Sequence, residues 1–149
     1  MDFLVDAGGY AGLLAASFLA ATVLPLSSEA LVMAMAAGGF SYPGILTVAT
    51  CGNVLGALVN YLAGRWGRRF WAGRRLRPPP DALLRAERFF GRWGSPVLFF
   101  AFAPVIGDPL TVAAGVLRIG LPVFLFWVTL GKALRYALLI AGVELWLWE

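Results

Sequence analysis

The chain has 149 residues, of which 60% are hydrophobic and only 13% charged, and its mean hydropathy is +0.80. Soluble domains carry about 25% charged residues, so this composition excludes a water-soluble globule and predicts an integral membrane protein. The length accommodates one domain, residues 1–149, and excludes a separate soluble catalytic domain. With no histidine and a single cysteine, zinc clusters, cysteine–histidine catalysis and an intramolecular disulfide are excluded as well.

The first predicted element is a helical hairpin. An apolar stretch over residues 10–24 is followed by the break LPLSSE, which contains Pro25 and Glu29, and then by a second apolar stretch over residues 30–40. Each half is too short to cross a bilayer comfortably, and a proline with polar neighbours joins them. We therefore predict a re-entrant hairpin that enters and leaves by the same face. The alternative that residues 7–24 form a full crossing stays open.

The next predicted element is a transmembrane helix over residues 44–64. Its length of about 20 residues matches a hydrocarbon core of ~30 Å. It contains Gly52 and Gly56, whose spacing creates a face of small residues that allows close helix approach. Packing within the monomer and a homodimer interface are both compatible with this face. Residues 10–64 together form the first predicted repeat.

A basic loop follows the first repeat. Residues 65–92 contain nine arginines and two acids, a net charge of +7, whereas the rest of the chain sums to −3. The positive-inside rule places such a loop in the cytoplasm, and the stretch is too short to form a nucleic-acid-binding fold. After three prolines, Asp81 can cap a new helix. That helix either lies in the membrane interface with its arginines towards anionic headgroups, or simply connects the two repeats. The loop and this helix occupy residues 65–93.

The second repeat, residues 94–143, matches the first without gaps at an offset of 79 residues. The plan recurs: apolar stretches over 94–103 and 109–119 flank the break APVIGD, which contains Pro104, Gly107 and Asp108, and a helix over 122–143 follows. The pairs that carry the match are prolines, glycines and polar residues: Pro25 with Pro104, Gly52 with Gly131, Glu29 with Asp108, and Asn53 with Lys132.

This repeat sets the predicted fold class and topology. A hairpin plus one crossing passes the membrane an odd number of times, so the second repeat is upside down relative to the first. The prediction is an all-α integral membrane protein built as an inverted repeat of a re-entrant helical hairpin plus a transmembrane helix, an architecture of many secondary transporters. With the basic loop inside, both termini face outside.

Five polar residues are predicted at membrane depth: Glu29, Asp108, Asn53, Lys132 and Arg135. A charge at the bilayer centre costs at least ~2.5–3.5 kcal/mol, and Lys132 and Arg135 share a helix face from which they can pair with the two acids. One interpretation is structural, with ion pairs that lock the hairpins to the crossing helices. The interpretation that intramembrane charges favour is a polar cavity for an anionic headgroup, with a carboxylate that exchanges protons.

At these residues the sequence resembles the DedA (VTT, SNARE-associated) membrane protein family, and most closely its short YqaA-like branch. LPLSSE is similar to the family's proline-rich break that ends in an acid, and LGKALRY is similar to the ending of the YqaA-like branch. The wider family has arginines three residues before and after the second signature proline, where this chain has Ala101 and Gly107. The resemblance implies opposed re-entrant hairpins, an inner-membrane location and a role in lipid movement.

The resemblance implies a membrane lipid translocase that moves undecaprenyl phosphate or a phospholipid across the bacterial inner membrane, and the acids at membrane depth lead us to expect that this movement is linked to protons. Its partners are anionic lipids or lipid phosphates and protons, with no nucleic acid and no cofactor. A small-solute or ion transporter and a non-transporting envelope assembly factor are the alternatives. Enzymatic activity is not expected, because no nucleophile–base or metal constellation exists in the sequence.

Overall fold

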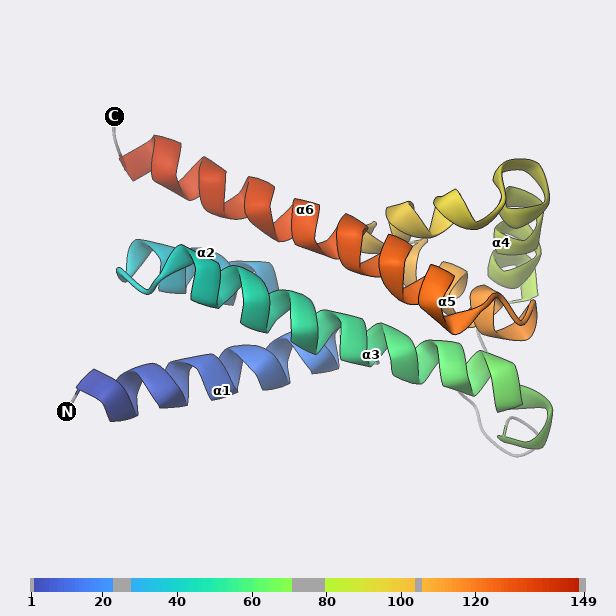
Figure 1. The fold of residues 1–149 in the computed structure, drawn as a ribbon, viewed down its shortest axis with the longest axis horizontal. Helices are drawn as coiled ribbons and strands as arrows, with labels where there is room; N and C mark the ends of the chain where they lie inside the picture. The colour runs from blue at the N-terminus through green and yellow to red at the C-terminus, as the bar shows by residue number, and fades with distance from the viewer. Residues whose placement is uncertain (1, 23–27, 71–79, 104–105, 148–149) are drawn as a thin grey trace. The chain divides into compact units, whose positions relative to one another are not determined.

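The computed structural model is built of helices throughout the part of the chain that it describes, residues 2–22, 28–70, 80–103 and 106–147 (Figure 1). Six α-helices and one 3-10 helix follow in chain order: α1 (Asp2–Ala20), α2 (Ser28–Ala37), α3 (Tyr42–Phe70), α4 (Pro80–Trp93), η1 (Ser95–Phe102), α5 (Gly107–Val116) and α6 (Leu121–Leu147). The breaks at Pro25 and Pro104 lie outside the described residues.

Two of the described helices are long and apolar enough to cross a membrane, by length and composition. They are the 26-residue stretches Tyr42–Gly67 of α3 and Leu121–Trp146 of α6. At 1.5 Å per residue each is about 39 Å long, which exceeds a hydrocarbon core of ~30 Å. Both helices extend past the predicted bounds of 44–64 and 122–143.

The chain divides into two compact units, and both long helices contribute to each of them. Unit 1 comprises residues 1–56 and 132–149, and unit 2 comprises residues 57–131. Unit 1 therefore holds α1, α2, the first half of α3 and the second half of α6. Unit 2 holds α4, η1, α5, the second half of α3 and the first half of α6. The units cut across the two sequence repeats, because each repeat gives half of its long helix to the other unit.

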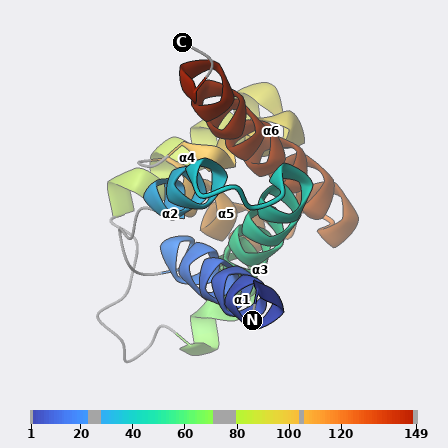
Figure 2. The same ribbon diagram turned by 90° about the vertical axis from the view of Figure 1, so that its left-hand side faces the viewer.

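In unit 1, α1 and α2 form a helical hairpin against the first half of α3 (Figure 2). Its core joins buried side chains of α1, α2, α3 and α6: Leu13, Val32, Met35, Ala36, Ile45, Ala49, Tyr136 and Ile140. Gly39 ends α2 with a φ of 83°, a left-handed conformation that glycine adopts without strain. Beyond it, Tyr10 binds the turn through a 3.0 Å hydrogen bond to the Ser41 hydroxyl and an edge-on contact with Phe40.

The small-residue face of α3 packs against α1. A methyl group added at Gly52 would lie 2.6 Å from the carbonyl oxygen of Leu14, and one at Gly56 would lie 2.6 Å from that of Phe18. Real side-chain carbons do not approach backbone oxygens so closely, so both positions require glycine. Of the two uses predicted for this face, the structure describes packing within the chain.

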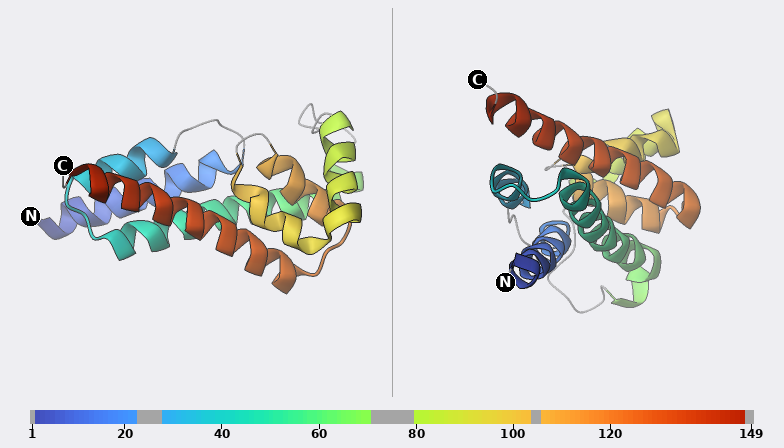
Figure 3. Two further views of the ribbon diagram at one scale, coloured as in Figure 1. Left: turned by 90° about the horizontal axis from the view of Figure 1, so that it is seen from above. Right: turned by 60° about the vertical axis from the view of Figure 1, so that its left-hand side comes forward.

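In unit 2, α4 packs on η1 and α5, which form the second helical hairpin (Figure 3). The first arm is a 3-10 helix, where only an apolar helix-forming stretch was predicted. It begins after Gly94, whose φ is 67°, and Pro96 near its start cannot donate a backbone hydrogen bond. The second arm packs on α3 through Gly64 and Gly115, since an added methyl group at either would overlap backbone atoms of the partner helix. The ring of Tyr61 on α3 stacks 4.5 Å from that of Phe124 on α6.

Candidate functional site

The polar cluster of unit 1 starts with an ion pair between α2 and α6. Arg135 Nη2 contacts Glu29 Oε1, and the two side chains are 26% and 35% exposed. Glu29 lies in the first turn of α2, where the partial positive charge of a helix N-terminus also favours a carboxylate. This pair is one of the acid–base combinations that the sequence allowed, and it remains accessible from outside the helices.

Two hydroxyl groups form a second link beside the ion pair. Ser28 Oγ and Tyr136 Oη lie 2.8 Å apart, and both residues are buried. Consecutive residues of α2 thus contact consecutive residues of α6. The Glu29–Arg135 ion pair is partly exposed, whereas the Ser28–Tyr136 contact is buried. A buried hydroxyl without a partner would cost about 1–3 kcal/mol, so the Ser28–Tyr136 contact holds the first turn of α2 at a fixed place on α6.

The third contact lies between the two long helices. Lys132 Nζ donates a hydrogen bond to Asn53 Oδ1, and both side chains are buried, with 5% and 6% exposed. The Asn53 amide group donates in turn to the backbone carbonyl of Ser17, at 3.1 Å. Asn53 therefore orients its oxygen towards the ammonium group and its nitrogen towards α1. The amide supplies the acceptor that an ammonium group requires in an apolar interior.

Lys132, Arg135 and Tyr136 share one face of α6, because spacings of three and four residues return to the same side of a helix. Their partners come from α2 and α3, and α1 joins through the Ser17 carbonyl that accepts from Asn53, so every helical segment of unit 1 contributes to the cluster. Two further hydroxyl oxygens, Ser17 Oγ and Thr50 Oγ1, are buried without a hydrogen-bond partner among the described residues. Buried hydroxyls of this kind commonly bind water. The cluster combines a carboxylate, two cationic groups and neutral hydrogen-bonding groups in an apolar setting.

Unit 2 carries the second acid. Asp108 lies in the first turn of α5, the position equivalent to that of Glu29 in α2. Its side chain is exposed, and Asn60 Nδ2 of α3 lies 3.5 Å from its Oδ1. The Thr111 hydroxyl donates to the Asp108 backbone carbonyl at 2.8 Å. Four of the five predicted site residues therefore meet in unit 1, and Asp108 has its own polar surroundings in unit 2.

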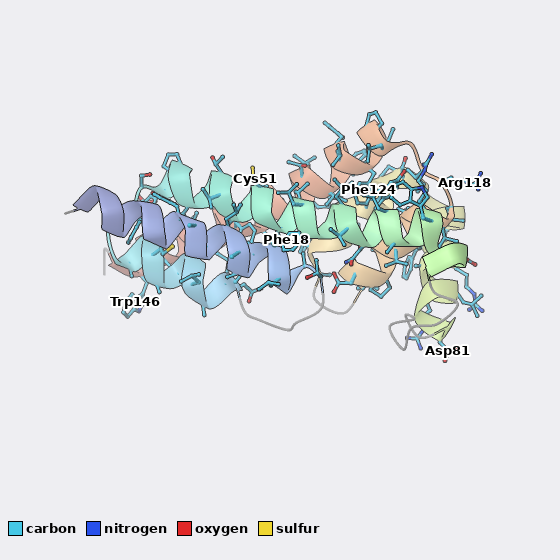
Figure 4. All side chains as sticks on the ribbon, turned by 90° about the horizontal axis from the view of Figure 1, so that it is seen from below. Phe18, Cys51, Asp81, Arg118, Phe124 and Trp146 are labelled. Carbon is cyan, nitrogen blue, oxygen red and sulfur yellow. The ribbon has the colours of Figure 1, made fainter. Side chains whose placement is uncertain are left out.

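No group of three or more histidine, cysteine, aspartate or glutamate side chains that could hold a metal ion occurs within the described ranges. The single thiol, Cys51, is exposed on α3 (Figure 4).

Comparison with known proteins decides the family. The family model for the VTT domain matches residues 24–145, which includes α2 to α5 and almost all of α6. The chain belongs to the VTT domain family. This VTT protein is 39% identical to "Inner membrane protein YqaA" of Escherichia coli over 138 residues, 91% of this chain and 92% of that protein. It is 35% identical to an uncharacterized protein of Haemophilus influenzae, over 83% of this chain and 80% of that one.

A more distant relative has a longer chain. This VTT protein is 34% identical to an "Alkaline phosphatase-like protein" of Lactococcus lactis over 110 residues, which are 66% of this chain but 50% of that protein. No solved structure matches the chain. The family membership and the two long apolar helices identify an all-helical membrane protein.

The two positions at which the wider family has arginines contact each other in this VTT protein. Ala101 of η1 is buried, and Gly107 opens α5. A methyl group added at Gly107 would overlap the carbonyl oxygen of Ala101. Small residues at these positions therefore bring the two arms of the second hairpin into backbone contact.

Several polar residues of the two units were not found from the sequence: Ser28 and Tyr136 of the unit 1 cluster, the buried hydroxyls of Ser17 and Thr50, and Asn60 beside Asp108 in unit 2. Their signal is weak, because serine, threonine and tyrosine occur in transmembrane helices without any functional role. The adjacency of Ser28 to Glu29 and of Tyr136 to Arg135 is the one feature that could have found two of them. A polar residue next to a charged one in an apolar helix is placed to reach the same partner helix.

Proposed function

We propose that this VTT protein is a proton-linked lipid translocase that moves a lipid or a lipid phosphate, such as undecaprenyl phosphate or a phospholipid, across the bacterial inner membrane. The observation that carries the proposal is the unit 1 cluster, in which the Glu29–Arg135 ion pair lies on the same face of α6 as the Lys132–Asn53 contact. The inner-membrane location rests on the name of the E. coli relative. We expect it to act as a carrier and not as an enzyme.

The groups of the cluster suit a phosphate headgroup. A guanidinium group presents a planar fork of donors that matches phosphate oxygens, and an ammonium group adds a compact positive charge. Arg135 and Lys132 provide these two groups one helical turn apart, and the Ser28 and Tyr136 hydroxyls can donate to further oxygens. Because Arg135 and Glu29 are partly exposed while Lys132 is buried, an arriving headgroup would meet Arg135 first.

Proton coupling follows from competition for one cation. In the resting state the Glu29 carboxylate binds Arg135. When Glu29 accepts a proton, its negative charge is lost and Arg135 becomes available to the phosphate oxygens. When the phosphate leaves, Glu29 releases the proton and binds Arg135 again. One proton is thus taken up as one anionic group binds, and no covalent bond forms or breaks except that to the proton.

The finer architecture belongs to the same proposal. We take α1–α2 and η1–α5 as re-entrant hairpins of an inverted repeat, with the segment 65–92 in the cytoplasm and both termini outside. Three observations support this. Both hairpins are too short in at least one arm to cross a membrane. The acids Glu29 and Asp108 open equivalent helices. Asn53 and Lys132, which are equivalent in the repeat, contact each other as expected for residues near a pseudo-two-fold axis.

The test is reconstitution of the purified protein in liposomes with fluorescent phospholipids and, separately, with undecaprenyl phosphate. We expect the protein to accelerate movement of at least one lipid, and Arg135→Gln to reduce that rate at least about tenfold, the value of one charge-assisted hydrogen bond. The matched control is Glu144→Gln, which changes one charge at an exposed position of α6 outside the cluster. Equal rates in protein-containing and empty liposomes would contradict the proposal.

The same liposomes distinguish the alternative functions. A change in the signal of a pH or ion indicator entrapped in the liposomes, without lipid movement, would favour a small-solute or ion transporter. Neither activity, with a normal fold, would favour an envelope assembly factor. Because the Lactococcus relative is named alkaline phosphatase-like, release of phosphate from p-nitrophenyl phosphate is measured in parallel, and none is expected.

A further inference from the structure

The arginines of α4 form a separate charged surface that the unit 1 cluster does not use. Arg85, Arg88 and Arg92 are all exposed. Their spacings of three and four residues place them on one stripe of the helix. We call this set the arginine stripe. The helix core lies on the other side: Ala86 and Phe90 are buried, with 1% and 8% exposed. Arg88 is two residues from each of them, and two residues turn a helix by about 200°. Arg88 therefore lies on nearly the opposite side of α4 from the buried residues.

Apolar side chains border the arginine stripe. Leu84 on one side and Phe89 and Trp93 on the other are 50%, 45% and 62% exposed. The Arg92 guanidinium lies 5.7 Å from the centre of the Trp93 ring, so part of the stripe is already ordered against an aromatic neighbour. A polyanion in water could neutralise the arginines but would leave these apolar groups exposed. A bilayer surface accepts both, because anionic headgroups lie directly above an apolar layer.

The direction of α4 fits a position along such a surface. Within unit 2, α4 lies at the end at which α3 ends, and it runs across the direction of α3 in two views at right angles (Figures 1 and 3). Residue Gly67 is the last of the candidate membrane span of α3, and its neighbour Trp66 is 64% exposed. Exposed tryptophan at the end of an apolar span is typical of the membrane–water interface. A helix that runs across the span at that end runs parallel to the membrane plane.

We infer that α4 is an interfacial helix whose arginine stripe binds anionic phospholipid headgroups of the cytoplasmic leaflet and thereby attaches the second hairpin to the membrane surface. The attachment reaches the hairpin directly, because α4 packs on both η1 and α5. This surface is independent of lipid translocation, and its occupant is the headgroup layer of the bilayer itself.

The test uses a fluorescent reporter on α4. Gly91 is an exposed position with nothing within 4 Å of an added Cβ, so Gly91→Cys in a Cys51→Ala background accepts an environment-sensitive dye without disturbing the packing. The labelled protein is placed in nanodiscs of phosphatidylcholine alone or of phosphatidylcholine with phosphatidylglycerol. We expect the dye emission to shift to the blue in the anionic discs, and the shift to disappear in about 1 M salt, where the screening length falls to ~3 Å.

Matched variants identify the groups responsible. The triple change R85Q/R88Q/R92Q should abolish the shift, whereas R85K/R88K/R92K, which keeps the charge, should retain it. A single Arg→Gln change on the stripe should weaken headgroup attachment roughly fivefold in a titration of phosphatidylglycerol content. Arg118→Gln removes an exposed arginine of unit 2 that lies outside α4 (Figure 4), and it should leave the titration unchanged.

Three results would overturn the inference. They are identical emission in the two kinds of disc at low salt, a triple Gln variant that responds like its parent, or a response to added single-stranded RNA without any response to phosphatidylglycerol. None of them bears on lipid translocation, so this inference and the proposed function can fail separately.

Discussion

Asn53 and Lys132, which occupy equivalent positions of the two sequence repeats, contact each other through a side-chain hydrogen bond. One repeat provides an amide at this position and the other an ammonium group. A self-contact of equivalent positions would otherwise bring together two identical residues, and two lysines there would repel each other. The divergence of the two repeats at this position creates a complementary donor and acceptor in the middle of the two long helices.

This complementarity predicts that the two residues can be exchanged. Lys132→Asn alone and Asn53→Lys alone should each destabilise the protein in detergent, by about 1–3 kcal/mol for a buried polar group without its partner. Asn53→Lys should cost more, because it places two ammonium groups side by side. The double variant N53K/K132N restores one amide and one ammonium group, and it should recover most of the loss. Thermal unfolding of the four proteins measures the recovery, and losses that simply add would show that the two residues do not interact.

The contact between Glu29 and Arg135 predicts a second coupling. Glu29→Gln and Arg135→Gln should each lower the free energy of unfolding, and the double variant should lose less than the sum of the two, with a coupling of roughly 1–3 kcal/mol. Chemical unfolding in detergent provides the four values. The cycle of Glu144→Gln with Arg135→Gln is the control, since Glu144 lies more than two turns further along α6 on an exposed position. A coupling in the control as large as in the pair would point to a general charge effect.

Glycine contacts in unit 2 predict a third set of stability changes. Gly115→Ala should strongly destabilise the protein, because the new methyl group would overlap the carbonyl oxygen of Tyr61 and push α5 away from α3. Overpacking of this kind costs about 1–3 kcal/mol or more. Gly142→Ala in α6 has nothing within 4 Å of the added atom, and it should be neutral or slightly stabilising because alanine favours the helix. Thermal unfolding of both variants measures the difference. Equal stability of Gly115→Ala and Gly142→Ala would contradict the packing of α5 on α3.

The sequence could predict much of the helical plan because proline, glycine and charge are conspicuous in an apolar chain. The repeat predicted that Glu29 and Asp108 would occupy equivalent places, and each lies in the first turn of its helix. The polar residues on the long helices were equally visible. Residues of opposite charge in a bilayer must find partners, so the existence of a cluster follows from the cost of leaving them alone.

The pairing within the cluster could not be predicted in the same way. A helix face gives the direction of a side chain but not the height and rotation of its neighbour, so Lys132 and Arg135 were equally suited to Glu29. The structure pairs Arg135 with Glu29 and Lys132 with Asn53. The 3-10 conformation of η1 was also beyond prediction, because its apolar sequence SPVLFFAF fits an α-helix equally well after the proline.

The proposed topology predicts a labelling pattern in intact cells. Single cysteines at positions 74 or 85, in a Cys51→Ala background, should be shielded from a membrane-impermeant thiol reagent, because the basic segment lies in the cytoplasm. Cysteines at positions 3 and 147 should react. Permeabilised cells are the control, in which all four positions should react. The opposite pattern would reject the orientation, and labelling at only one end of the chain would make the first hairpin a full crossing.

The two acids carry the prediction that separates transport from scaffolding. Glu29→Gln and Asp108→Asn keep the size of each side chain and much of its hydrogen bonding but remove its titration. If Glu29 exchanges a proton as Arg135 exchanges the carboxylate for a phosphate, then Glu29→Gln should still fold and insert but should move lipid at a rate that no longer depends on pH. Lipid movement in liposomes, measured at a series of pH values, gives the profile.

The profile of each variant distinguishes the roles of the two acids. Asp108→Asn should also flatten the pH dependence if both hairpin breaks carry protons, whereas a change in Glu29→Gln alone would restrict proton exchange to the unit 1 cluster. A lipid phosphate should be affected more than a zwitterionic phospholipid, because its headgroup depends more on Arg135 and Lys132. Glu144→Gln, again the control, should keep the native profile. If both acid variants move lipid at the native rate and with the native pH profile, the acids are structural, and the proton-linked mechanism is wrong.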